Sequence, residues 1–184
     1  MANRAYLYSA NEDFTQIRDL SESRYPIPFF YKIVMGEDTS ICESQIWDYP
    51  QPIAIKANFE KGFNKLLALF DYLQTQKELD SAAIAQYRKE TTDFFEREKG
   101  RIHTYFFLEG SEIFELLGEP IELLNSDLYN DILAISAQVN DILANKPLDV
   151  FAFSEAAWLH AMKKDVSFLS VYWTHVTYIS FNRT

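Results

Sequence analysis

Cysteine and glycine are both scarce in this sequence, with one cysteine and five glycines among 184 residues. Because Cys42 has no second cysteine to pair with, no disulfide can form within the chain, and nothing indicates an oxidising compartment. We expect its thiol to be buried and structural. The glycines are isolated, so the sequence contains neither a glycine-rich phosphate loop nor a Gly-x-Ser-x-Gly nucleophile elbow.

Long apolar runs are also missing. Nowhere do eighteen apolar residues follow one another, which is about the length that a membrane-spanning helix needs. The first eight residues, Met-Ala-Asn-Arg-Ala-Tyr-Leu-Tyr, lack the apolar core of a signal peptide. We therefore expect no membrane span and interpret the protein as cytoplasmic.

Positive charge is in short supply. There are 17 Lys and Arg against 27 Asp and Glu, which gives a net charge of −10. Affinity for nucleic acid comes from cationic side chains that displace counterions, and anionic lipid repels an acidic protein. The sequence therefore predicts no nucleic-acid or membrane partner. A basic protein is the partner that this charge would attract, although an acidic surface also serves solubility alone.

The one-signed charge is densest in residues 102–145, which contain no Lys or Arg. Apolar residues repeat there at three- and four-residue steps, at Leu124, Leu128, Ile132, Ile135, Val139 and Ile142, as on the buried face of a helix. Like charges one helical turn apart cost about 0.2–0.5 kcal/mol per pair, so we expect something to offset that cost. The candidate partner-binding residues in this stretch are Glu112, Glu115, Glu119, Asp127, Asp131 and Asp141.

A second candidate binding element is the run Trp47, Asp48 and Tyr49, which is followed by Pro50 and Pro52. Large rings on a proline-stiffened loop anchor interfaces at low entropic cost. The alternative, that the rings complete the core under the loop, is equally compatible with the sequence.

Catalytic and metal-binding signatures are not evident. The three histidines, His103, His160 and His175, are far apart in sequence, and no His-Glu-x-x-His motif is present. We expect no catalytic residue, no metal site and no cofactor. An enzyme that assembles distant residues stays open, with Asp or Glu as acid or base and His160 or His175 assisting.

The predicted elements fall into three regions. Alternating or β-branched residues predict strands over residues 4–9, 29–34 and 53–56, with a turn of helix over 12–20. Helical periodicity predicts a hairpin of helices over 58–76, capped by Asn58, and 80–99, capped by Asp80. Residues 102–108 fit either state. Ser111 is expected to cap a short helix that Gly118 ends, and Pro120 to open the long acidic helix.

Near the C-terminus, Phe153, Ser154 and Glu155 are expected to open one more short helix. Residues 169–181 then alternate with apolar character on both faces, which predicts a long strand inside a sheet. We find no repeat or linker, so we treat residues 1–184 as a single domain.

Four short motifs resemble a family of uncharacterised bacterial proteins of similar length. They lie at residues 3–8 (Asn-Arg-Ala-Tyr-Leu-Tyr), 46–49 (Ile-Trp-Asp-Tyr), 52–55 (Pro-Ile-Ala-Ile) and 59–62 (Phe-Glu-Lys-Gly). These motifs carry no known chemistry, so the resemblance implies no catalytic residue. In size and acidity the chain is also similar to small immunity proteins that neutralise bacterial toxins, a likeness of type that favours a binding function only by analogy.

The sequence thus predicts an α+β fold in which helices, including a helical hairpin and a long acidic helix, pack on a small, mainly antiparallel sheet. The favoured function is non-catalytic binding, most concretely as an immunity protein whose acidic helical face occludes a cationic bacterial toxin. The alternatives are a small-molecule enzyme and a self-associating structural protein, such as a homodimer joined through aromatic residues.

Overall fold

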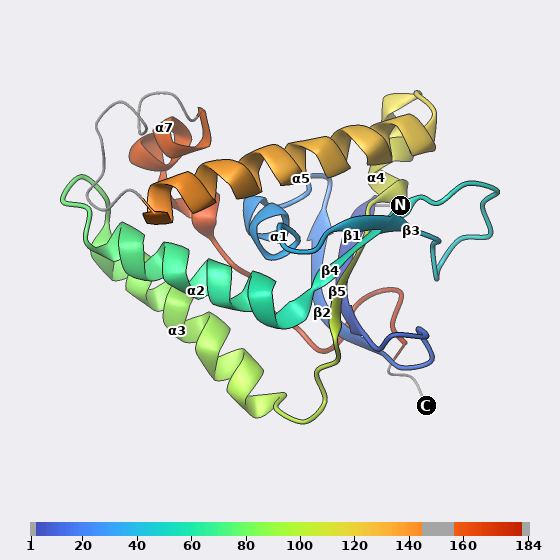
Figure 1. The fold of residues 1–184 in the computed structure, drawn as a ribbon, viewed down its shortest axis with the longest axis horizontal. Coiled ribbons are helices and arrows are strands. Elements are labelled where there is room, and N and C mark those ends of the chain that lie inside the picture. Colours follow the sequence, from blue (N-terminus) through green and yellow to red (C-terminus); the bar gives the residue numbers. More distant parts are fainter. Residues whose placement is uncertain (1–2, 145–156, 182–184) are drawn as a thin grey trace.

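The structure is a computed structural model that describes residues 3–144 and 157–181. Its centre is a five-stranded sheet in the order β2-β1-β5-β4-β3 (Figure 1). The strands are β1 (Arg4–Ala10), β2 (Ile17–Arg24), β3 (Ser40–Cys42), β4 (Ala54–Asn58) and β5 (Tyr105–Glu109). Every neighbouring pair is antiparallel. The fold is therefore α+β, as the sequence predicts.

Helices pack against one face of this sheet (Figure 1). They are α1 (Phe29–Val34), α2 (Phe59–Gln74), α3 (Ser81–Arg97), α4 (Ser111–Phe114), η1 (Glu115–Leu117), α5 (Ile121–Ala144), α7 (Ala157–Lys164) and η2 (Val166–Leu169). The predicted hairpin of α2 and α3 is confirmed, because the two consecutive helices pack against each other. Asn58 caps α2 through the Lys61 N–H, and Asp80 caps α3 through the amides of Ala82 and Ala83.

The two faces of the sheet bury different residues. Leu7, Ile55 and Phe106 belong to the large core under the helices. Tyr6, Tyr8, Ala10, Ala54 and Phe107 form a smaller core on the opposite face, against Phe14, Ile179 and Phe181. Because side chains alternate along each strand, both faces are apolar and both need a cover.

The predicted strand over residues 29–34 is wrong, because these residues form α1. Five of its six residues are buried, so it lacks the polar face that identifies a helix in sequence. The predicted turn of helix over residues 12–20 is also wrong. Asn11 accepts a hydrogen bond from the Gln16 N–H, and Asp13 accepts one from the Thr15 N–H. These two bonds stabilise a turn, after which the chain enters β2.

The predicted C-terminal strand is wrong as well. Residues 170–181, here called the C-terminal segment, cross the sheet without joining it as a strand. Carboxylates of β2 accept its N–H groups: Asp19 accepts from Thr177 and Phe181, and Glu22 accepts from Tyr178. One backbone bond also forms, from the Thr174 N–H to the Leu20 carbonyl, but from Thr177 onward side chains replace the carbonyls of a strand ladder. Val171 belongs to the large core and Phe181 packs against the smaller one.

The helices that follow β5 also differ slightly from the prediction in where they begin. Ser111 is the first residue of α4 and makes no capping hydrogen bond, since Gly110 occupies the cap position. The carbonyl of Pro120 accepts the N–H groups of Leu123 and Leu124, so α5 begins just after Pro120. Gly118 ends η1 with a left-handed φ of 71°, as its type allows. The predicted helix start at residues 153–155 lies outside the described residues.

Candidate functional site

The carboxylates of residues 102–145 divide into two groups in the structure. Four of them have partners among the described residues: Glu109, Glu112, Glu122 and Asp131. The other four are exposed and make no ion pair or side-chain hydrogen bond with a described residue: Glu115, Glu119, Asp127 and Asp141. Only the carboxylates of the second group carry a charge that no described residue pairs with or hydrogen-bonds.

Glu112 belongs to the fold. Its carboxylate accepts hydrogen bonds from the backbone N–H of Arg4, at 3.1 Å, and from the hydroxyl of Tyr6, at 2.9 Å. Burial and this bond raise the pKa of the Tyr6 hydroxyl. Glu112 thus ties α4 to β1, and its carboxylate is bonded within the fold.

Asp131 is paired with a cation that arrives from another element. Lys32 on α1 lies 2.5 Å from its carboxylate. The two residues also line a cavity of about 390 Å³ between α1, α5 and α7, with Phe29, Trp158 and Phe168. The carboxylate and the ammonium there bind each other, so the charge of Asp131 is balanced within the fold.

Glu109 on β5 is buried under the loop that joins β3 to β4. Its carboxylate accepts hydrogen bonds from the Ser44 hydroxyl and the Gln45 N–H, the latter at 2.7 Å. Burial raises its pKa to about 7, although these bonds favour the charged form. The Ser44 hydroxyl oxygen in turn accepts the N–H groups of Ile46 and Trp47, so Glu109 fixes the turn that leads to Trp47.

The Trp47 loop and the acidic helix meet in space. The Tyr49 hydroxyl donates to the carboxylate of Glu122 in the first turn of α5, at 3.0 Å. Figure 1 shows this loop, residues 43–53, projecting beside the N-terminal end of α5. Trp47 stays 40% exposed, so it does not complete the core. The structure thus brings together two stretches that the sequence identifies separately.

Three exposed leucines lie at the same end, and the sequence does not identify them as candidate binding residues. Leu116, Leu117 and Leu123 are 58%, 60% and 56% exposed. The first two lie on η1, which follows α4, and Leu123 lies in the first turn of α5, which α4 contacts. A signal for Leu123 does exist, since it falls on the opposite side of α5 from the buried stripe.

The exposed residues at this end, on the Trp47 loop, on η1 and at the start of α5, are together called the acidic end: Trp47, Glu115, Leu116, Leu117, Glu119, Leu123 and Asp127. On an ideal helix Leu123 and Asp127 are one turn apart on one side. Asp141 is on the same side but fourteen residues further, about 21 Å away at 1.5 Å per residue. Asp48 is exposed on the Trp47 loop.

The dipole of α5 stabilises only some of these carboxylates. Glu119 lies just before α5 and Glu122 in its first turn, where a carboxylate interacts favourably with the helix dipole by about 0.3–1 kcal/mol. That interaction offsets their mutual repulsion. Asp127 and Asp141 lie beyond the first turn, where this interaction has fallen off. Their charge has no stabilising counterpart among the described residues.

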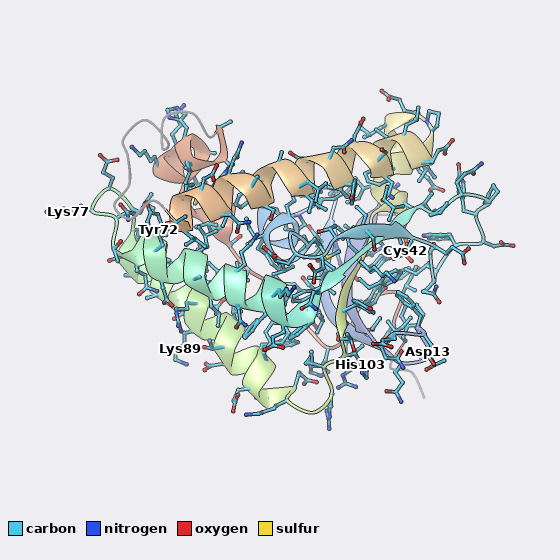
Figure 2. The ribbon with its side chains drawn as sticks, in the orientation of Figure 1. Asp13, Cys42, Tyr72, Lys77, Lys89 and His103 are labelled. Carbon is cyan, nitrogen blue, oxygen red and sulfur yellow. The ribbon has the colours of Figure 1, made fainter. Side chains whose placement is uncertain are left out.

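The histidines and the cysteine are not brought together. His160 and His175 are exposed on different segments. Burial, together with the positive charge of Arg18, lowers the pKa of His103. Figure 2 shows His103 and Asp13 at the opposite end of the sheet from α4, with Cys42 on β3. Burial raises the pKa of Cys42 to about 12. Within residues 3–144 and 157–181, no three His, Cys, Asp or Glu side chains form a metal-binding group.

Comparison with known proteins identifies a family without assigning chemistry. The model of a domain of unknown function, DUF7822, matches residues 5–148. This range contains the acidic end and leaves out α7 and the C-terminal segment. No curated protein and no solved structure matches the chain. Among the described helices, none is both long and apolar enough to cross a membrane.

Proposed function

We propose that this chain, which belongs to the DUF7822 family of domains of unknown function, is a non-catalytic binding protein whose acidic end docks a basic protein. The observation that supports the proposal is the exposed set Glu115, Glu119 and Asp127, at the end of α5 to which Tyr49 fastens the Trp47 loop. Since residues 102–144 contain no Lys or Arg, nothing within this stretch neutralises the set.

Electrostatic steering is the physical basis of the proposal. A surface of one sign attracts a partner of opposite sign over roughly a Debye length, about 10 Å at 0.1 M salt, and raises its association rate. Asp141 extends the same field along α5. The charge therefore acts on the rate of encounter, while apolar contacts such as Trp47 act on the lifetime of the complex.

A cationic bacterial toxin is the partner that we propose most concretely, with this protein as its immunity protein. The small size and the acidity of the chain support this by analogy with such proteins. A gene for a secreted toxin next to the gene for this protein would supply the partner for the experiment that follows.

The experiment measures the association rate with such a basic partner as salt is raised from about 50 mM to about 500 mM, a range that shortens the Debye length severalfold. We expect the rate to fall about tenfold or more. Glu115→Gln/Glu119→Gln/Asp127→Asn should lower the low-salt rate by a similar factor, because it removes the charge that steers the partner.

The control is Glu12→Gln/Glu60→Gln/Glu90→Gln. It removes three exposed carboxylates elsewhere and so changes the net charge equally. It should leave the association rate near that of the unmodified protein. Equal rates for the two variants would mean that net charge acts without any particular surface, and the acidic end would then have no role.

A further inference from the structure

We infer that the acidic end is shaped for one kind of partner segment, a basic amphipathic helix. The apolar stripe of that helix would cover Leu116, Leu117, Leu123 and Trp47, and its Lys and Arg would contact Glu115, Glu119 and Asp127. This inference rests on the proposed function, and it adds the chemistry and the conformation of the docking segment.

The apolar part of the surface is the first argument. Single exposed leucines are common on proteins, but here three lie within eight consecutive residues, on η1 and the adjoining turn of α5. Trp47 is added by the loop that Tyr49 fastens to Glu122. Tryptophan is a residue type that anchors interfaces, and the exposed leucines at the same end of the molecule add apolar area that burial would remove from water.

The fixed backbone beneath these side chains is the second argument. Gly118 ends η1 in the left-handed conformation, and the Pro120 carbonyl accepts the Leu123 N–H at 3.1 Å. The Trp47 N–H donates to Ser44, which Glu109 holds. Because the anchors lie on bonded turns and helices, a partner orders little of this surface on binding.

Charge complementarity selects the occupant. The carboxylates Glu115, Glu119 and Asp127 repel acidic segments and favour Lys and Arg. The leucines require apolar side chains between those cations, because an exclusively polar chain would leave them in water. An apolar stripe with cationic flanks satisfies both conditions, and it excludes a nucleic acid or a purely lysine-rich tail.

Backbone geometry favours a helix over an added strand. Strand addition needs a sheet edge with free backbone groups, and the edge strand β3 has only three residues, Ser40–Cys42. The acidic end instead presents side chains of η1 and α5, whose backbone groups serve mainly their own helices. A helix recognises such a surface through residues at i, i+3, i+4 and i+7.

The test uses a synthetic peptide of Leu and Lys, about 18 residues long, with its leucines at helical spacing. An isomer of the same composition, scrambled to remove the stripe, is the peptide control. Titration calorimetry gives the dissociation constants, and tryptophan fluorescence reports burial of Trp47, since Trp158 is buried and Trp173 is partly buried. We expect the helical peptide to bind about tenfold or more tightly than its isomer.

Leu116→Ser/Leu117→Ser/Leu123→Ser should weaken binding of the helical peptide by about tenfold or more, because it removes apolar area that the peptide would bury. The matched control is Leu133→Ser/Tyr172→Ser/Val176→Ser, which changes three exposed apolar residues elsewhere and should bind as the unmodified protein does. Circular dichroism confirms that both variants are folded, which their exposed positions favour.

Other results would overturn the inference in distinguishable ways. If both peptides bind equally, and only Glu115→Gln/Glu119→Gln/Asp127→Asn weakens them, the proposed function stands and the helix inference fails. If no acidic-end variant alters binding, or neither peptide binds, the acidic end is not a docking surface for this chemistry. If light scattering shows a dimer that the leucine variant dissociates, the occupant is a second copy of the chain.

Discussion

Gly62 lies where α2 crosses α1, and the approach of the two backbones leaves no room for a side chain. A Cβ atom added there would lie 2.0 Å from the carbonyl oxygen of Val34. Because that atom belongs to the main chain of a buried helix, the contact cannot be relieved by a rotamer change. The position of α1 over the sheet therefore depends on the absence of a side chain at Gly62.

We predict that Gly62→Ala lowers the free energy of unfolding by about 1–3 kcal/mol, even though alanine favours a helix by about 1 kcal/mol. The control is Asn64→Ala on the exposed side of α2, which should stay within about 0.5 kcal/mol of the unmodified protein. Urea denaturation measures both. A Gly62→Ala protein as stable as its parent would show that α1 and α2 separate easily.

Glu109 gives stability a defined pH dependence. Burial raises its folded-state pKa from 4.5 to about 7, so between these values the folded protein holds a proton that the unfolded chain has lost. Its stabilising contribution is complete below pH 4.5 and is lost as the pH rises towards about 7.

We therefore predict that Glu109→Gln, which cannot ionise, gains stability relative to the unmodified protein as the pH rises. The gain has a limiting slope of about 1.4 kcal/mol per pH unit. Urea denaturation from about pH 5 to about pH 8 measures it. A difference that does not change with pH would place the Glu109 carboxylate in water rather than under the Trp47 loop.

Among the elements, the C-terminal segment depends most on side chains of another strand. Asp19 is fully buried on β2, and its carboxylate accepts the N–H groups of Thr177 and Phe181 and the hydroxyl of Ser180. Trp173 packs among Phe30, Phe94 and Phe95 at ring-centroid distances of 4.9, 5.9 and 4.8 Å. One end of the segment is thus held by rings and the other by a carboxylate.

We predict that Asp19→Ala releases the carboxylate-bound end while Trp173 stays in place. Hydrogen exchange at the amides of Thr177 and Phe181 should accelerate about tenfold or more, because a buried donor without an acceptor costs about 1–3 kcal/mol. Asp13→Ala, in the exposed turn before β2, is the control and should leave both amides protected. Unchanged exchange in Asp19→Ala would mean that contacts other than this carboxylate hold the segment.

The elements also show how far the sequence predicts this fold. The α2–α3 hairpin is predicted because each helix exposes one face, so the period of 3.6 is visible in its residues. The strand predicted over residues 29–34 and the one predicted over residues 169–181 are both wrong, and the two stretches share a sequence pattern. Both stretches contain aromatic and apolar runs that resemble an interior strand, but residues 29–34 are buried as a helix, whereas Tyr172, Val176 and Tyr178 of the second stretch are exposed.

At the scale of the whole molecule, the candidate surface is less predictable than the fold. The sequence identifies the missing cations of residues 102–145, but it cannot show that Lys32 reaches Asp131 or that Tyr6 reaches Glu112. Those partners come from segments about a hundred residues away. The joining of the Trp47 loop to α5 through Tyr49 and Glu122 is equally a result of tertiary structure.

The position of the edge strands has a consequence for the protein in concentrated solution. One margin of the sheet is β2, along which the Thr174 N–H donates to the Leu20 carbonyl, and the other is the three-residue β3. An exposed edge strand can pair with strands of further chains and so begin a fibril, whereas a short or covered edge strand resists such pairing. Release of the C-terminal segment would therefore expose the edge strand β2 to aggregation as well as destabilise the fold.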